Sequence, residues 1–269
     1  MHRTLLSALA LSCLLAKDLP AEDAFEMPVS GEILPGWVQA DGTRVIGLRM
    51  KLAPGWKTYW RSPGDAGIPP TFDWRGSENL KGVGITWPAP GVFLTAGMRT
   101  IGYEGDVVLP IALAPTRKGE PISLQATVDM GVCKDICIPH RMTLEAFIDD
   151  QNTKPTPAIA AALAARPYSA QDADVSYVTC ALRPTEDGLA ITATLDMPAI
   201  GRDEIVIIEP GQPGVWMSET QTERANGMLV AVGEMMLSDG SPIALDRDDV
   251  TITVLGQNHA VEIRGCDPG

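Results

Sequence analysis

The sequence predicts an all-β protein made of two antiparallel β-sandwiches in tandem, joined by a short helical connector. Three observations predict this fold. Most of the chain alternates apolar and polar residues with a period of two, which is typical of half-buried strands. Turn signals such as Asp41-Gly42, Asp187-Gly188 and Asn226-Gly227 separate these stretches. Glycine and proline, with 26 and 22 residues, favour many turns and few long helices.

Residues 1–21 are predicted to be a secretory signal peptide. The chain begins with a short basic segment, Met1-His-Arg, and the apolar run 4–16 is too short to cross a bilayer core of ~30 Å as a helix. Cleavage is expected after Ala16 or Ala21. Export would place the mature chain in an oxidising compartment, in which disulfides persist. Lipid anchoring at Cys13 is the weaker alternative, because the residues before it match a lipoprotein cleavage site poorly.

The composition disfavours some classes of partner. The formal net charge is −13 at pH 7, so the chain repels nucleic acid and anionic lipid head groups. Hydrophobic residues make up 45 %, which is enough for a packed core. No segment after the signal reaches 18 uninterrupted apolar residues, so we expect the mature chain to be soluble.

The first sandwich is expected over residues 25–150. Its clearest strands are 122–130, where apolar and polar residues alternate without a break, and 141–148. Arg61 and Asp65 are expected to form an ion pair that fixes a turn. A set of aromatic residues is expected to fill the core and the sheet edges rather than to line a binding groove. The set is Trp56, Tyr59, Trp60, Trp74 and Trp87.

Residues 151–171 are expected to link the two sandwiches. The alanine-rich run 154–165 predicts a short helix there, with Thr156 as its N-cap and Pro157 at the first helical position. The second sandwich is expected over residues 172–269. Its alternating stretches are 174–182, 189–195 and 250–254.

Four cysteines remain after the signal, Cys133, Cys137, Cys180 and Cys266, and they allow three pairings. The division into domains favours Cys133 with Cys137 and Cys180 with Cys266. Cys180 lies in the opening strand of the second sandwich and Cys266 follows the final one, and such strands can be neighbours. A link across 86 positions would stabilise the fold by about 4–5 kcal/mol in the chain-entropy model. We therefore predict a structural disulfide between Cys180 and Cys266.

The close spacing of Cys133 and Cys137 predicts a different role. Closing so short a loop removes little chain entropy, so stabilisation explains this pair poorly. The flanking strands place both cysteines at a hairpin tip, where an exposed disulfide can form and is easier to reduce. Lys134 favours a Cys133 thiolate and Asp135 opposes it, so the charges do not decide which sulfur attacks. The pattern predicts thiol–disulfide exchange.

Copper binding is the alternative for the same residues. Cys133, Cys137, His140 and Met142 supply soft ligands suited to copper. The run resembles copper motifs of cytochrome oxidase and of Sco-type delivery proteins, although the spacing to the histidine and the methionine is one residue short of the oxidase motif at each step. Zinc is disfavoured because a four-ligand site is hard to assemble here. His140 is otherwise expected to be a surface residue near the thiols.

Five motifs occur in order along the first predicted sandwich. They are GWKTYWRSPGD at 55–65, GIPPT at 67–71, ITWPAP at 85–90, GYEGDVVLP at 102–110 and VCKDICIP at 132–139. Together they resemble the periplasmic N-terminal domain of the DsbD thiol:disulfide interchange family, and the suppressor-of-copper-sensitivity B branch in particular. The resemblance covers about residues 25–150. It extends more loosely to the second sandwich through VEIRGC at 261–266.

The resemblance implies immunoglobulin-like sandwiches and a redox role for one cysteine pair. It assigns Cys133 and Cys137 as the exchange pair, with Cys137 as the better candidate for the sulfur that contacts partners. Family members shield this pair with an aromatic cap loop. Phe93 is the nearest match for the cap, and Tyr103 for an aromatic beside it. No organic cofactor is expected, because the disulfide is itself the redox group.

Two departures from the family pattern affect the expected partners. The best-known members space their two cysteines more widely than this chain does. They also carry a transmembrane domain and a thioredoxin-like domain, which this sequence lacks. We therefore expect either a periplasmic electron carrier that exchanges disulfides with periplasmic thioredoxin-like proteins and is served by a separate membrane electron-transfer protein, or a branch that has kept the fold for another use.

Overall fold

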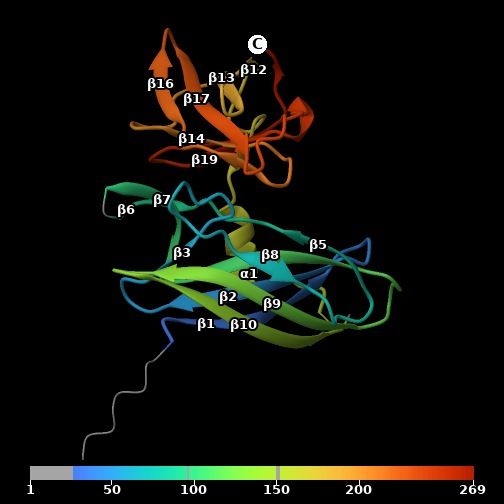
Figure 1. The fold of residues 1–269 in the computed structure, drawn as a ribbon. Coiled ribbons are helices and arrows are strands. Elements are labelled where there is room, and N and C mark those ends of the chain that lie inside the picture. The colour runs from blue at the N-terminus through green and yellow to red at the C-terminus, as the bar shows by residue number, and fades with distance from the viewer. Residues whose placement is uncertain (1–26, 96, 150–151) are drawn as a thin grey trace, which may run out of the picture.

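The structure of the chain, a computed structural model, describes residues 27–95, 97–149 and 152–269. The predicted signal peptide, residues 1–21, and Cys13 lie outside the described residues. Within the described part, no helix has the length and apolar character needed to cross a membrane. Figure 1 shows two β-rich bodies, with the second stacked on one end of the first.

The first body consists of two sheets. The strands of one sheet, in spatial order, are β1 (Val29–Val38), β2 (Arg44–Leu52), β8 (Asp106–Pro115) and β5 (Leu80–Ile85). Those of the other are β10 (Cys137–Ile148), β9 (Ile122–Cys133), β3 (Lys57–Tyr59), β7 (Met98–Glu104) and β6 (Gly91–Thr95), with β4 (Thr71–Asp73) also pairing with β9. All of these pairings are antiparallel.

The core of the first body lies between these two sheets. Along β9 the even-numbered side chains, such as Ile122, Leu124 and Val128, are buried against the other sheet, whereas the odd-numbered ones up to Asp129 lie on the outer face. This alternation is the period-two pattern of the sequence. Trp60, directly after β3, is fully buried in the same core. The inner and outer faces of the β9 sheet decide where each candidate site residue lies.

A short helix, α1 (Pro157–Ala164), follows the first body. Pro157 occupies its first turn, as expected, but the Thr156 side chain does not cap the helix. The Thr156 hydroxyl instead donates a hydrogen bond to the Pro35 carbonyl. The helix packs against β8 and β2, and Ile159 is fully buried there. The predicted connector helix is therefore part of the packing of the first body.

The second body also has two sheets. One orders β11 (Tyr168–Ser169), β19 (Ala260–Arg264), β18 (Thr251–Leu255) and β14 (Ile205–Glu209). The other orders β15 (Val215–Met217), β17 (Met228–Leu237), β13 (Leu189–Asp196), β12 (Tyr177–Pro184) and β20 (Asp267–Pro268), with β16 (Gln221–Ala225) also on β17. A 3-10 turn covers Arg247–Asp249. The short pairings of β11 with β19 and of β12 with β20 are parallel, and the others are antiparallel.

The β14–β18–β19 sheet is buried on both faces. One face, with Val206, Ile252 and Val261, packs into the core of the second body. On the opposite face, Ile207 and Leu255 belong to the same hydrophobic cluster as the core of the first body. The two bodies therefore share a continuous apolar contact.

The predicted fold class is confirmed: the described chain is mostly β, with two sandwich-like bodies and one short α-helix. The predicted boundaries at residues 150 and 172 stay a prediction. Within the predicted linker, Tyr168–Ser169 already pairs with β19 of the second body.

Candidate functional site

The Cys133–Cys137 disulfide lies at the tip of the β9–β10 hairpin. The two residues are directly opposite each other in the register, with their Cα atoms 4.1 Å apart. The Lys134 backbone amide donates to the Ile136 carbonyl across the tip at 3.1 Å. The long, regular pairing behind the tip, which continues to Ile122 and Ile148, holds the two sulfurs in place.

The disulfide is exposed on one side only. Cys137 is exposed, whereas Cys133 retains only 7 % of its accessible surface. Ile136, between them, is 68 % exposed and presents an apolar side chain beside the bond. An approaching protein can therefore reach Cys137 more readily than Cys133.

Tyr59 supplies a hydrogen-bond donor to both sulfurs. Its hydroxyl oxygen lies 3.0 Å from Cys133 Sγ and 3.2 Å from Cys137 Sγ. Because disulfide sulfurs carry no proton, the tyrosine O–H is the donor. Burial raises the pKa of Tyr59 above its ordinary value of 10.0. The hydroxyl therefore keeps its proton at neutral pH.

Glycine at position 131 makes room for the Tyr59 ring. β3 pairs with β9 beside the hairpin tip, and Lys57 lies opposite Cys133. Lys57, Tyr59, Gly131 and Cys133 occupy alternate positions on one face of this sheet, the face away from the core. A β-carbon at Gly131 would lie 3.0 Å from Tyr59 Cε2, so any larger residue would press on the ring.

Two lysines have their backbones next to the pair, but their side chains extend toward other segments. Lys57 lies opposite Cys133 in the register, and its ammonium sits 4.7 Å from the centroid of the Phe93 ring. Lys134 folds back over Gly55, where a β-carbon would lie 3.2 Å from Lys134 Cε. The donor that contacts the sulfurs is therefore the Tyr59 hydroxyl.

The comparisons with known proteins agree with this geometry. Residues 22–148 match the family model described as "Thiol:disulfide interchange protein DsbD, N-terminal". Residues 22–148 belong to this family. The matched segment of the DsbD N-terminal domain ends at the last residue of β10, so it contains the whole cysteine hairpin.

A solved structure resembles the chain well beyond the DsbD N-terminal domain. The crystal structure of the N-terminal periplasmic domain of ScsB from Proteus mirabilis matches with a TM-score of 0.65 and 23 % sequence identity. The match covers 90 % of this chain and 92 % of the other. At this identity it establishes a shared fold that includes both sandwich-like bodies. No curated protein matches the sequence at a significant level.

The two aromatic residues predicted to shield the pair lie in different places. Phe93 pairs with Thr100, and the register through Gly102 puts Phe93 on the same face of the sheet as Tyr59. Tyr103 instead belongs to the hydrophobic core, and its hydroxyl donates to the Pro88 carbonyl at 2.7 Å. The aromatic residue in contact with the sulfurs is Tyr59. The cap role of Phe93 stays a prediction.

The copper alternative needs four side chains to converge, and the hairpin separates them. Cys137 lies on the outer face of β10, whereas His140 and Met142 alternate with it and point to the inner face. Met142 packs against β1, where a β-carbon at Gly31 would meet its sulfur. Among the described residues, no cluster of three or more His, Cys, Asp or Glu residues is arranged to hold a metal ion. Nothing in this arrangement favours copper over exchange.

The second disulfide joins Cys180 to Cys266, 86 positions apart. Cys180 is fully buried in the core of the second body. The disulfide lies beside the pairing of β12 with β20, which brings the first long strand and the last strand of this body together. Unlike Cys137, Cys180 offers no surface to a partner.

The aromatic set was assigned to the core, and one member has a second role. Trp60 is fully buried, and Trp56, Trp74 and Trp87 pack against the same core from partly exposed positions. Tyr59 is nearly as buried but lies on the outer face against the disulfide. Tyr59 lies opposite Gly131 because β3 pairs with β9. The sequence alone does not show which strand lies beside β3, so it does not indicate this contact.

The predicted ion pair between Arg61 and Asp65 is wrong. The Arg61 guanidinium binds Glu209 and Glu262, both in the second body. Asp65 accepts a hydrogen bond from the backbone amide of Glu219, also in the second body. Arg61 and Asp65 therefore both contact the second body. The sequence did not indicate these contacts, because the partner residues lie far away along the chain.

Proposed function

We propose that this chain is a periplasmic thiol–disulfide exchange protein that passes electrons to or from partner proteins through Cys133 and Cys137. The observation that carries the proposal is the hydrogen bond from Tyr59 to a disulfide with one exposed and one buried sulfur. A disulfide that only held the hairpin together would need neither the donor nor the exposed sulfur.

Partners reach the pair through Cys137. A partner thiolate attacks the exposed Cys137 sulfur, the Cys133–Cys137 bond breaks, and Cys133 leaves as a thiolate. The Tyr59 O–H stabilises the negative charge that develops on Cys133. A second partner thiol then attacks the partner's half of the mixed disulfide, which leaves an oxidised partner and a reduced pair.

The same steps run in reverse when the reduced chain meets an oxidised partner. The Cys137 thiolate attacks the partner disulfide and forms the mixed disulfide. Cys133 then attacks Cys137, which releases the partner with two thiols and restores the Cys133–Cys137 bond. The direction in the cell depends on the relative reduction potentials of the partners.

Thioredoxin-like proteins of the periplasm are the proposed partners. The similarity to a periplasmic domain of ScsB and to the DsbD N-terminal family supports this choice. The exposed Ile136 beside Cys137 provides an apolar contact for a partner's active-site surface. We propose that a separate membrane protein supplies or removes the electrons.

The test is a redox titration of the purified chain with reduced and oxidised glutathione. Alkylation and mass spectrometry would count the free thiols of each pair. We expect the Cys133–Cys137 pair to equilibrate at periplasmic potentials, while Cys180–Cys266 stays oxidised and serves as the internal control. If both pairs resist reduction equally, the proposal is wrong.

A trapping experiment tests the roles of the two sulfurs. Cys133→Ser leaves the exposed Cys137 to form a mixed disulfide that cannot resolve. Cys137→Ser leaves only the buried Cys133. With a purified, oxidised thioredoxin-like protein, we expect the first variant to accumulate the covalent complex and the second to form much less. Equal trapping would contradict the assignment of Cys137 as the contact sulfur.

A further inference from the structure

The loop after β3 lies between the disulfide and the second body. We call residues 61–68 the Arg61–Ile68 loop. On one side it covers Tyr59: a β-carbon at Gly67 would lie 3.0 Å from Tyr59 Cδ1, and one at Gly131 would lie 3.1 Å from Ile68 Cβ. Tyr59 is therefore enclosed between this loop and the β9 backbone at Gly131, and only 6 % of its surface is exposed.

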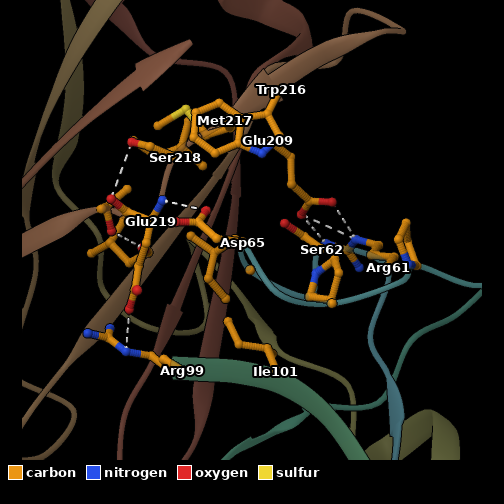
Figure 2. Close-up of a pocket in the computed structure, with 18 of the residues that line it drawn as sticks. Arg61, Ser62, Asp65, Arg99, Ile101, Glu209, Trp216, Met217, Ser218 and Glu219 are labelled. Carbon is orange, nitrogen blue, oxygen red and sulfur yellow. Dashed lines mark hydrogen bonds and ion pairs between the residues drawn. The ribbon is translucent and has the colours of Figure 1, made fainter. Parts of the chain in front are cut away.

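The other side of the loop is held by carboxylates of the second body. Arg61 forms a fork with Glu209, with Nε to Oε1 at 2.9 Å and Nη2 to Oε2 at 2.8 Å. The same Nη2 donates to Glu262 Oε2 at 2.7 Å. Figure 2 shows the Arg61–Glu209 fork, and beside it Asp65 accepting from the backbone amide of Glu219.

These ion pairs are more shielded from water than surface ion pairs, so each should contribute more to holding the loop. All three side chains are half-buried, with 21–22 % of each side chain exposed. Burial lowers the pKa of Arg61, but the hydrogen bonds and charges of Glu209 and Glu262 outweigh burial, so the net pKa is raised. The guanidinium also stacks on the Trp60 ring at 4.3 Å, one residue from Tyr59.

Packing alone does not hold the loop against the second body. A cavity of about 390 Å³ lies between the two, and its lining includes Ser62, Pro63 and Asp65 on one side and Trp216 and Met217 on the other. A backbone hydrogen bond from the Ile101 amide to the Pro63 carbonyl ties the middle of the loop to β7, and the polar contacts at Arg61 and Asp65 hold the loop against the second body. Loss of the contacts at Arg61 would release the start of the loop, next to Tyr59, while the Pro63 hydrogen bond remains.

We propose that the second body acts as a buttress for the redox site, with Arg61 as a positioning residue that keeps the Tyr59 hydroxyl on the sulfurs through the Arg61–Ile68 loop. The proposal rests on the exchange function proposed above. Glu209 and Glu262 take part without touching either sulfur. In this arrangement the second body tunes the exchange chemistry of the first.

The test measures the rate at which dithiothreitol reduces the Cys133–Cys137 disulfide in the full chain. Tyr59→Phe removes the donor to the leaving Cys133 thiolate, and we expect the rate to fall about tenfold, as for loss of a hydrogen bond to a charged group. Arg61→Gln keeps Tyr59 but releases the loop, and the rate should fall about three- to tenfold.

A double-mutant cycle separates positioning from general damage. If Arg61 acts through Tyr59, Arg61→Gln should have little further effect in a Tyr59→Phe background. Glu209→Gln with Glu262→Gln should reproduce the Arg61→Gln effect from the other side of the contact, and it serves as the second variant if Arg61→Gln folds poorly. Thermal unfolding of each variant verifies that it is folded at the assay temperature.

Arg224→Gln is the matched control. Arg224 forms an equally forked ion pair with Glu204, but both residues lie in the second body and away from the loop. We expect this variant to lower stability without changing the reduction rate.

The outcomes distinguish this inference from the function on which it rests. If Tyr59→Phe slows reduction while Arg61→Gln and the double glutamate variant do not, the proposed role of the second body is wrong and the exchange function stands. Additive effects of Arg61→Gln and Tyr59→Phe would also overturn it. If the Cys133–Cys137 pair resists reduction in the wild type, the exchange function itself fails.

Discussion

The Tyr59 hydroxyl contacts Cys133 Sγ at 3.0 Å and Cys137 Sγ at 3.2 Å, so a single donor serves both ends of the disulfide. The contact depends on close approach of two strands and on the missing side chain of Gly131. Stabilisation of a leaving thiolate is an electrostatic effect, and it is stronger where the donor is shielded from water. These dependences lead to predictions about the site and about the fold that carries it.

Gly131→Ala should weaken the contact between Tyr59 and the sulfurs. The new β-carbon would press on the ring and on Ile68, so the hydroxyl should shift and reduction by dithiothreitol should slow several-fold. Overpacking should also cost about 1–3 kcal/mol of stability. Gly82→Ala is the control, because its β-carbon would meet nothing closer than 3.9 Å. Equal rates for both alanine variants would show that the ring is not confined as described.

Tyr59 should ionise at higher pH than an ordinary tyrosine. Burial raises its pKa in the folded chain above 10.0, whereas the unfolded chain keeps the ordinary value. The corresponding stability is fully present below pH 10 and is lost as pH rises through the folded-state pKa. The tyrosinate absorbance of the wild type minus that of Tyr59→Phe measures the titration. A midpoint at or below pH 10 would contradict the burial argument.

The two disulfides should differ in their effect on stability. Replacing Cys180 and Cys266 by serine opens a link 86 positions long, for which chain entropy predicts a loss of about 4–5 kcal/mol. Replacing Cys133 and Cys137, four positions apart, should cost about 2 kcal/mol by the same relation. Urea unfolding measures both. A larger loss of stability for the Cys133 and Cys137 replacements would show that Cys180–Cys266 is not the main structural disulfide.

The two bodies should unfold together. Ile207 and Leu255 of the second body belong to the core cluster of the first, so separating the bodies would expose apolar surface on both. Five of the six tryptophans lie in the first body, and Trp216→Phe removes the sixth. Its fluorescence transition in urea should therefore coincide with the loss of circular dichroism, which reports both bodies.

A second variant tests the same coupling from the interface. Ile207→Asp places a charge in the shared cluster and should split the single unfolding transition in two. Ile191→Ala is the control, because Ile191 lies in the core of the second body alone. That variant should lower the midpoint but keep one transition. Two separate transitions in the wild type would rule out coupled unfolding.

Local patterns predicted the parts of the fold that depend on neighbouring residues. The alternation at 122–130 correctly predicted β9, because burial of one face of a strand imposes a period of two. Pro157 gave the start of α1 because its ring suits a first helical turn. The cysteine hairpin followed from two such strands joined by a short turn.

Contacts between distant segments were out of reach for the same reasoning. Nothing near Arg61 in the sequence indicates Glu209 or Glu262, which lie 148 and 201 positions away. The nearest carboxylate along the chain, Asp65, was the natural but wrong partner. Tyr59 was missed as a site residue because its role depends on which strand lies beside β3. The continuous apolar run Ile205–Ile208 is typical of a strand buried on both faces. It could have indicated that this sheet is covered by the first body as well.

The doubly covered β14–β18–β19 sheet limits how this protein can be divided. Cutting the chain near residue 166 would leave the C-terminal half with a bare patch that includes Ile205, Ile207 and Leu255, of the kind that promotes aggregation. Neither half is therefore a portable module. Transplanting either one into a fusion protein would require polar substitutions on the surface that its neighbour now covers.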